Sequence, residues 1–396
     1  MQPRAEQPRA EQPRAEESAA APSRPGWAES IKQQALGHAV SATCWLDPGN
    51  SGDRYPVSVR FSGRRAGASG QPQQGDRFDH TETIGDVMPG SGPVSVTAKV
   101  TDVTPGEWIV WARPDAGTAK GGPPMRPLPA PPAGRLGLGR LLRSKGNPVP
   151  AGNTGTRVMT RPGGYATGPG LVPASWLPLV AVGVVAALAV QAVLAGRAHL
   201  SIGAGLGVSL AASVAGAAGA RAWYVALNRG KVQGMPTQGL CIQGFIVAAV
   251  AVLIAGLALA GIPIRTFLDI SAPGLFFAMA IGRQGCFLHG CCVGRPTGSQ
   301  WGIWASDGRV GARRAPTQQL ESLGSLVIGL AALLLVLQAR PPAGTIFIGA
   351  LAAYTVCRQI LFRYREEPRR SSFGRRASLI AAGLVLLADI IAAIVA

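Results

Sequence analysis

Arg283 is the residue whose type and surroundings best suit chemistry in this sequence. It stands near the end of an apolar run, within a glycine-rich stretch at residues 281–304. An arginine at the centre of a bilayer costs about 2.5–3.5 kcal/mol on insertion scales, and irregular backbone at that depth survives only inside protein or beside a polar cavity. Because a guanidinium binds phosphate through paired N–H groups, the stretch predicts a phospholipid headgroup site. The plainer interpretation is an arginine that reaches the interface.

Two later segments carry polar residues next to apolar runs. Residues 314–321 open one such run, and Glu321 there either favours the helix dipole or takes part in a site. Tyr354, Arg358 and Arg365 follow the end of the next run at helical spacing. If these residues lie on one side of a helix, they form a site for an anionic lipid headgroup. The alternative is that the two arginines are the positively charged flank of a membrane helix.

A fourth segment contributes Arg221 and Tyr224, at the end of the second apolar run. If that helix packs on the one carrying Arg283, two cations lie at comparable depth in the membrane.

Three cysteines stand close to Arg283: Cys286, Cys291 and Cys292, with His289 between them. A zinc site commonly uses Cys-x2–4-Cys pairs, so this spacing is only weakly consistent with a metal site. A disulfide and small apolar packing residues are the other interpretations. Packing is the interpretation we favour, so we expect no metal and no cofactor.

The elements that must position these residues are helices that cross a membrane. Residues 171–396 are dominated by Ala, Leu, Val, Ile and Gly, and Leu171–Gly196 is uncharged over a length that spans about 30 Å of hydrocarbon. The sequence predicts an all-α polytopic bundle of about seven transmembrane helices. The expected spans are 171–196, 200–220, 240–262, 266–285, 322–339, 343–361 and 378–396.

The first 170 residues have the composition of a protein in water. Residues 1–26 begin with a charged Glu-Gln-Pro-Arg-Ala repeat and predict a disordered arm. Residues 27–114 predict a small β-rich module, because polar and apolar residues alternate in 57–61 and 94–100; Trp27–His38 is expected to be a short helix. Residues 115–170 are rich in Pro, Gly and Arg and predict a basic linker.

The net charge of +18 favours an anionic membrane surface over nucleic acid, because many arginines lie between apolar runs. Counting Lys and Arg in the loops places the N-terminus in the cytoplasm by the positive-inside rule. Arginines that bind headgroups would inflate that count, so the orientation stays open.

The order of these segments resembles the bacterial prolipoprotein diacylglyceryl transferases. It runs Gly-Ala-Arg-x-x-Tyr, Asp269-x-x-Ala-Pro273, Gly-Arg-x-Gly-x-Phe-x-x-Gly-x-x-x-Gly-Arg, Pro-Thr-Gln-x-x-Glu, and then Tyr354, Arg358 and Arg365. The resemblance covers about 171–396, and the first 170 residues have no counterpart. It implies transfer of a diacylglyceryl group from phosphatidylglycerol to the lipobox cysteine of a preprolipoprotein, at the outer face of the bacterial plasma membrane.

The resemblance also implies roles for single residues. Arg283 matches the essential arginine of the family, and Arg365 matches the arginine of its late block. The remaining residues that it places at the headgroup are Arg221, Tyr224, Gly294, Glu321 and Arg358.

This chain departs from the family pattern at several of these blocks. Gln243 replaces the family histidine that is a candidate base for the thiol, and glutamine accepts no proton at neutral pH. His289 is the residue that could replace that base. Other departures are Cys286 for an asparagine, a cysteine at 291, Ala315 for a histidine and Phe362 for a glutamate.

Three classes of function are compatible with these features. The first is a divergent transferase whose partners are phosphatidylglycerol, membrane lipids and lipobox preprolipoproteins. The second is an inactive phospholipid-binding paralogue that recruits a partner through its N-terminal module. The third is a membrane thiol redox protein that uses Cys286, Cys291 and Cys292.

Overall fold

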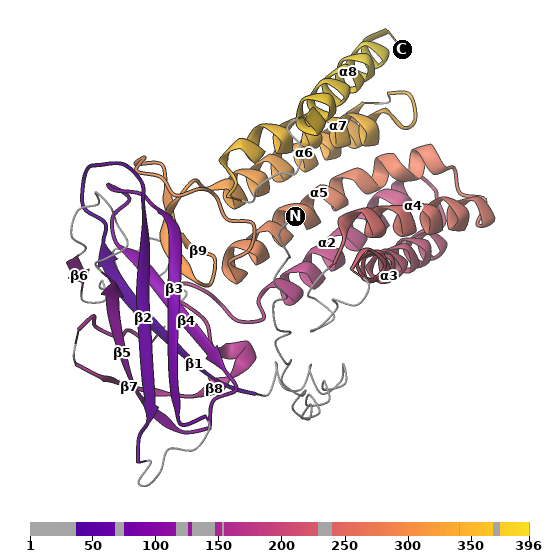
Figure 1. Cartoon of the computed structure of the whole chain (residues 1–396). Helices are drawn as coiled ribbons and strands as arrows, with labels where there is room; N and C mark the ends of the chain where they lie inside the picture. Colours follow the sequence, from indigo (N-terminus) through magenta and orange to yellow (C-terminus); the bar gives the residue numbers. More distant parts are fainter. Residues whose placement is uncertain are drawn as a thin grey trace, which may run out of the picture.

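The computed structural model consists of a β-sandwich at one end of a bundle of long helices (Figure 1). It describes residues 37–67, 75–115, 126–128, 147–152, 154–228, 240–339, 341–366 and 373–395. The arm at 1–26, the first part of the β-rich module and much of the expected linker lie outside these residues.

The sandwich is built from two antiparallel sheets. One sheet has the order β6-β1-β4-β10-β9, with β8 also paired to β1, and the other has the order β3-β2-β5-β7. The strands are β1 (His38–Asp47), β2 (Tyr55–Arg65), β3 (Arg77–Val87), β4 (Val94–Thr101), β5 (Glu107–Asp115), β6 (Arg126–Leu128), β7 (Thr156–Met159), β8 (Arg161–Pro162), β9 (Ile303–Ser306) and β10 (Val310–Arg314).

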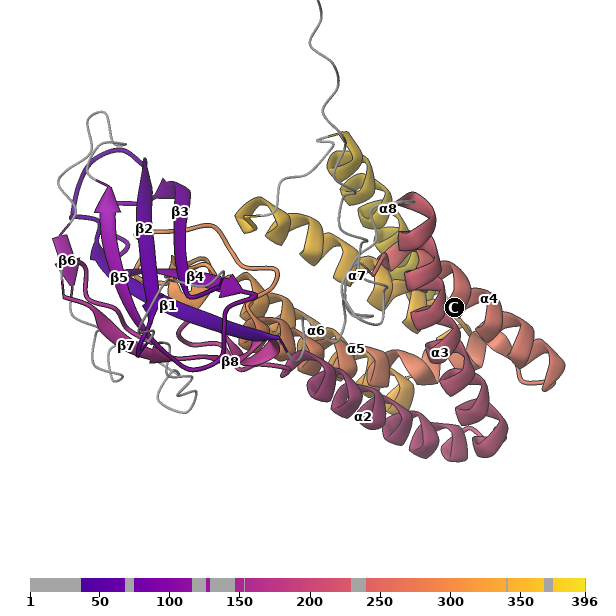
Figure 2. The same cartoon turned by 60° about the horizontal axis from the view of Figure 1, so that its bottom comes forward.

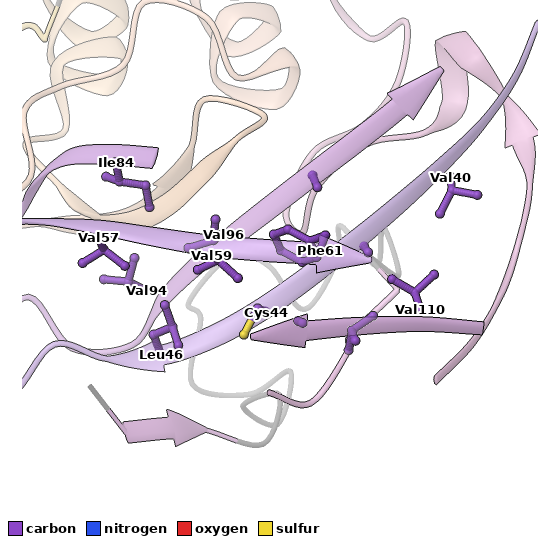
Figure 3. Close-up of a cluster of buried hydrophobic side chains, with 14 of the residues drawn as sticks. Val40, Cys44, Leu46, Val57, Val59, Phe61, Ile84, Val94, Val96 and Val110 are labelled. Carbon is purple, nitrogen blue, oxygen red and sulfur yellow. The ribbon is translucent and has the colours of Figure 1, made fainter. Parts of the chain in front are cut away.

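Apolar side chains from both sheets meet between them and form one core (Figure 3). Alternate residues of a strand face the same side, so Val57, Val59 and Phe61 of β2 all point inward. Trp108 of β5 is fully buried, and its ring nitrogen donates a hydrogen bond to the Thr104 carbonyl, 3.0 Å away. The alternation in the sequence therefore identified the strands and the faces that they bury.

Cys44 offers a test of this core through its pH dependence. It is buried in β1 between the sheets, and burial raises the pKa of its thiol to about 12. The folded state thus holds the neutral thiol, while an unfolded chain ionises it near about 8.5. The free energy of unfolding is expected to fall as pH rises above about 8.5 toward 12, by up to ~1.4 kcal/mol per pH unit. Urea unfolding at pH 8 and pH 10 measures this loss, which a Cys44→Ala chain should lack. An equal loss in both chains would contradict the assignment.

Two expectations for the N-terminal region need correction. His38 begins strand β1, and residues 27–36 of the expected helix lie outside the described residues. The expected linker at 115–170 contains β6, β7 and β8, which pair with β1 and β5. These strands are short and carry proline or arginine, so they give little periodic signal, and pairing with longer strands fixes them instead.

Seven long helices make up the C-terminal part of the chain. They are α2 (Trp176–Arg197), α3 (Ile202–Leu227), α4 (Ile242–Leu259), α5 (Ile264–His289), α6 (Thr317–Gln338), α7 (Thr345–Leu361) and α8 (Phe373–Val395), with short 3-10 turns η3 (Gly163–Tyr165) and η4 (Phe362–Tyr364). In the described residues, six spans, α2 to α6 and Thr345–Tyr364, are long and apolar enough to cross a membrane. The chain is a multi-pass membrane protein, as the sequence predicts.

Small residues let these helices approach closely. A Cβ added at Gly183 of α2 or at Gly274 of α5 would come within 3.0 Å of the backbone of the other helix. Gly219 of α3 and Gly244 of α4 face each other in the same way. In lipid, such backbone contact gains van der Waals packing that larger residues would prevent. The result is two close pairs, α2 with α5 and α3 with α4, and α6 and α7 follow on the other side of α5 (Figure 2).

A buried carboxylate fixes the start of α7. The two oxygens of Asp269 accept hydrogen bonds from the backbone N–H groups of Gly344, at 2.6 Å, and Phe347, at 2.9 Å. The first N–H groups of a helix have no partner within it, and a membrane offers them no water. Asp269 therefore satisfies these groups and sets the position of α7 against α5.

The β9–β10 hairpin joins the sandwich to the bundle. It connects α5 to α6, and β10 pairs with β4 at Val310–Val96 and Gly311–Ser95. Trp304 of β9 stacks on Trp45 of β1, with ring centroids 5.8 Å apart. The sandwich thus lies at the end of the bundle where α5 ends and α6 begins (Figure 1).

Candidate functional site at the sandwich end of the bundle

Arg283 points into the protein and not into solvent. Its side chain is 13% exposed, and its Nε lies 2.8 Å from an oxygen of Glu321, whose side chain is 2% exposed. A second nitrogen of Arg283 donates a hydrogen bond to the Tyr354 hydroxyl, at 3.2 Å. Helices α5, α6 and α7 thus each contribute one polar side chain to one buried cluster. Glu321 lies in the second turn of α6 and pairs with arginine, so it does not serve as a helix cap.

Two further guanidinium groups reach the same cluster. Arg358 donates a hydrogen bond to Tyr354, at 3.0 Å, and Arg365 lies 3.8 Å from the second oxygen of Glu321. Both guanidinium groups also pack on the Phe362 ring, 5.3 Å and 5.1 Å from its centroid. The spacing predicted that Arg358 and Arg365 lie on one continuous helix, and this prediction is wrong. Helix α7 ends at Leu361, and the 3-10 turn η4 separates it from Arg365.

Backbone pairing holds Arg365 in place. Gly294 and Arg365 form an isolated β-bridge, and the Arg295 N–H donates to the Tyr364 carbonyl, at 2.8 Å. A Cβ at Gly294 would lie 2.1 Å from the Ala315 carbonyl oxygen, so only glycine fits between these segments. Gly294 therefore acts in the structure by allowing this close approach.

Arg314 is a buried arginine whose charge is already satisfied. It is 1% exposed and forms ion pairs with Asp307, at 3.1 Å, and with Glu366. It also donates hydrogen bonds to the carbonyls of Gly294, at 3.1 Å, and Val310, at 3.2 Å. Arg314 thereby links the β9–β10 hairpin to the segment that carries Arg365.

The cluster around Glu321 carries more positive than negative charge. Arg283, Arg358 and Arg365 bring three positive charges, whereas Glu321 is the one carboxylate that pairs with Arg283 and Arg365 among the described residues. Among the described residues, the Nε of Arg365 and one oxygen of Glu321 are buried and have no hydrogen-bond partner. Buried charges normally have partners, so this cluster is suited to an anion.

Three thiols lie beside the cluster. The Sγ atoms of Cys286, Cys291 and Cys292 all lie within 4.8 Å of one another. The chain reverses at Gly290, which has a φ of 81° and ends α5, and this turn brings Cys291 and Cys292 back to Cys286. Hydrogen bonds from the other two thiols, followed by the positive charges of Arg365 and Arg283, lower the pKa of Cys292.

The other four residues named from the sequence lie on α3, at the start of α4 and at the end of α5. Arg221 has its guanidinium 5.8 Å from the ring of Tyr224, on the α3–α4 hairpin. Gln243 is exposed at the start of α4 and accepts a hydrogen bond from the Cys241 thiol, at 2.7 Å. His289 is exposed at the last residue of α5.

The position of Arg221 follows from how α3 packs. Its main neighbour is α4, and it contacts α5 at the opposite end of the bundle, where Phe267 lies against Gly205. The structure therefore does not show the packing that would bring Arg221 beside Arg283.

Sequence reasoning missed the roles of three residues. Phe362 carries two guanidinium groups, Arg314 connects two segments, and Ser322 accepts a hydrogen bond from Gln284, at 2.9 Å. The sequence gives Phe362 only as a departure from the family pattern, and Arg314 only as the first residue of the segment 314–321. The acidic partners of Arg314 are Asp307 and Glu366. The sequence alone does not reveal these pairs, because Glu366 lies 52 residues further along the chain.

The fold defines a polytopic membrane protein with a cluster of arginines around a buried carboxylate at one end of its bundle. Comparison with known proteins places it further. The family model for prolipoprotein diacylglyceryl transferase matches residues 176–395, and the chain belongs to that family.

Curated relatives agree with this family. The chain is 30% identical over 172 residues to a phosphatidylglycerol--prolipoprotein diacylglyceryl transferase of Dehalococcoides mccartyi, covering 42% of this chain and 64% of that protein. It is 36% identical over 97 residues to the protein of that name from Chloroflexus aggregans, covering 23% and 32%. It is 31% identical over 159 residues to the protein of the same name from Finegoldia magna, covering 38% of this chain and 62% of that protein. The chain thus spans less than two thirds of the length of these relatives.

Proposed function

We propose that this protein transfers the diacylglyceryl group of phosphatidylglycerol to the lipobox cysteine thiol of a preprolipoprotein, at the bacterial plasma membrane. The observation that carries the proposal is the excess of positive charge formed by Arg283 and Arg365 around the buried Glu321, with Arg358 joined to the same cluster through Tyr354. A phosphodiester brings one negative charge and several acceptor oxygens into such a cluster. The names of the relatives supply the reaction.

The reaction needs a leaving group that departs as an anion. The sulfur of the acceptor attacks the glycerol carbon that carries the phosphate ester, a C–S bond forms, and the C–O bond to phosphate breaks. Glycerol phosphate leaves with the bonding electrons. In the proposed site, Arg283 and Arg365 hold the phosphate, and their charges stabilise the oxygen on which negative charge develops. Shielding from water strengthens this effect, and both side chains are largely buried.

The acceptor thiol must also lose a proton. The three arginines accept none, and Glu321 is engaged by Arg283. His289 is exposed at this end of α5, and a neutral imidazole nitrogen accepts a proton, so we assign it the role of base. Gln243, Arg221 and Tyr224, on the α3–α4 hairpin, are assigned to orienting the substrates, with Gln243 acting by hydrogen bonds alone.

The decisive test uses the full chain in vesicles that contain phosphatidylglycerol. A synthetic lipobox peptide is expected to gain the mass of one diacylglyceryl group, in step with release of glycerol phosphate. Vesicles of phosphatidylethanolamine at equal surface area are the control and should give no product. Binding of phosphatidylglycerol by native mass spectrometry without any product would reject the transfer and leave an inactive lipid-binding paralogue that recruits its partner through the sandwich.

A further inference from the structure

The three thiols beside Arg283 have no part in the reaction proposed above, although they form a tight group. Cys286 is buried at the end of α5, and Cys291 and Cys292 are partly buried after the turn at Gly290. All three Sγ atoms lie within 4.8 Å of one another, and no disulfide joins them in the structure. Three sulfur atoms at such separations need only small side-chain movements to contact one ion.

We propose that Cys286, Cys291 and Cys292 bind one monovalent copper ion. Thiolates are soft ligands, and they select soft ions such as Cu(I), zinc or iron–sulfur clusters. A structural zinc ion takes four ligands in a tetrahedron, but no His, Asp or Glu joins the three thiols among the described residues. Three sulfur ligands complete the coordination of Cu(I), whereas zinc would need a water molecule or another ligand in the fourth position.

The charges around the thiols support the same assignment. Metal binding requires deprotonated cysteines, so three thiolates and one Cu(I) carry a net charge of −2. Arg283 lies one turn before Cys286 on α5, and Arg365 pairs with Gly294, two residues after Cys292. Their positive charge stabilises this anionic complex, and the attraction is stronger at the buried Cys286 than it would be in bulk water. The proposal does not depend on whether the protein transfers a diacylglyceryl group.

The backbone of the turn holds the second and third ligands. Cys292 has a φ of 59°, in the left-handed region that residues other than glycine seldom adopt. The Cys291 N–H donates to the Cys286 carbonyl, at 3.0 Å, and the Cys291 carbonyl accepts from Gln318 Nε2, at 2.9 Å. These bonds fix the turn against α5 and α6, so the thiols are arranged before an ion arrives.

Copper titration of the full chain in detergent tests the proposal. Under anaerobic conditions with a thiol-free reductant, Cu(I) is added alone, in competition with the chelator bathocuproine disulfonate. We expect one ion per chain in the wild type. The Cys286→Ser, Cys291→Ser and Cys292→Ser chains should each bind at least about tenfold more weakly. Cys357→Ser is the matched control, because that thiol is also partly buried on α7 and lies outside the group; it should bind like the wild type.

X-ray absorption of the copper-loaded wild type provides a second measurement that needs no variant. We expect a first coordination shell of three sulfur atoms. Nitrogen or oxygen ligands in that shell, tighter binding of zinc than of Cu(I) at the same thiols, or equal affinity in the wild type and the triple Cys→Ser chain would each overturn the proposal. So would isolation of the native protein with a disulfide between Cys286 and either of the other two cysteines.

Discussion

Replacing Arg283 by alanine is expected to lower the rate of diacylglyceryl transfer about a thousandfold. Removal of one group that stabilises a developing anion in an enclosed site costs about 10²–10³ in rate, and Arg283 brings a full charge. The change also leaves Glu321 with Arg365 alone, at 3.8 Å, so a buried carboxylate loses its closest partner. The measurement is the initial rate of lipobox-peptide labelling in phosphatidylglycerol vesicles, with the melting temperature recorded for each chain.

Two further chains separate charge from folding in this experiment. Arg283→Lys keeps the charge but loses the paired N–H groups, so an intermediate rate is expected. Arg309→Ala is the matched control: it removes an arginine from the same end of the molecule, where it pairs with Glu82 at an exposed position, and should leave the rate unchanged. An Arg283→Ala chain that melts like the wild type and keeps more than about a tenth of its rate would refute the phosphate-binding role.

The architecture could be predicted from the sequence wherever a segment lies wholly in lipid or in a strand with one buried face. Long uncharged runs located the helices, because only a continuous apolar stretch crosses lipid. Six of the seven expected spans qualify with shifted ends in the described residues, whereas α8, at the seventh, is a helix that does not qualify. Strands with regular alternation, such as β2 and β4, were predicted for the same kind of reason. The short strands β9 and β10 were not, because β10 depends on pairing with β4, more than 200 residues earlier in the chain, and β9 pairs with β10.

The orientation problem shows why charge counting was insufficient. Several arginines that count as loop charges are used within the fold. Arg309 pairs with Glu82, Arg314 pairs with Asp307 and Glu366, and Arg295 donates to the Arg365 carbonyl. The positive-inside rule applies to charges that are free to face the cytoplasm. Since the sandwich and the arginine cluster lie at the same end of the bundle, both must face the same side of the membrane.

The site was predictable in its parts but not in its contacts. The sequence singled out Arg283, Glu321, Arg358 and Arg365, since charged residues near apolar runs are costly without a purpose. It could not show that Glu321 pairs with two of these arginines, because three helices must first pack. The expected proximity of Arg221 to Arg283 depended on packing of α3 against α5 at this end, and the structure pairs α3 with α4.

Arg314 should dominate the stability of this end of the molecule although it does not touch the proposed phosphate site. Replacing it by alanine removes two ion pairs and its hydrogen bonds to the carbonyls of Gly294 and Val310, of which the second also accepts from the Asp307 N–H. Loss of one partner of a fully buried pair costs about 3–5 kcal/mol. Asp307 and Glu366 are partly exposed, at 29% and 41%, so water takes over part of the interaction. We therefore expect a loss of about 2–3 kcal/mol in the free energy of unfolding.

The consequence for activity follows from what Arg314 connects. Its bond to the Gly294 carbonyl supports the bridge that holds Arg365, so Arg314→Ala should also lower the transfer rate, and phosphatidylglycerol at higher density should restore part of it. Thermal unfolding in detergent and proteolysis across 297–316 measure the first effect. Arg313→Ala is the matched control, because Arg313 directly precedes Arg314, lies on the other face of β10 and makes no ion pair among the described residues. If both variants melted alike, the connection assigned to Arg314 would be wrong, because its partners would then stabilise this end of the protein without it.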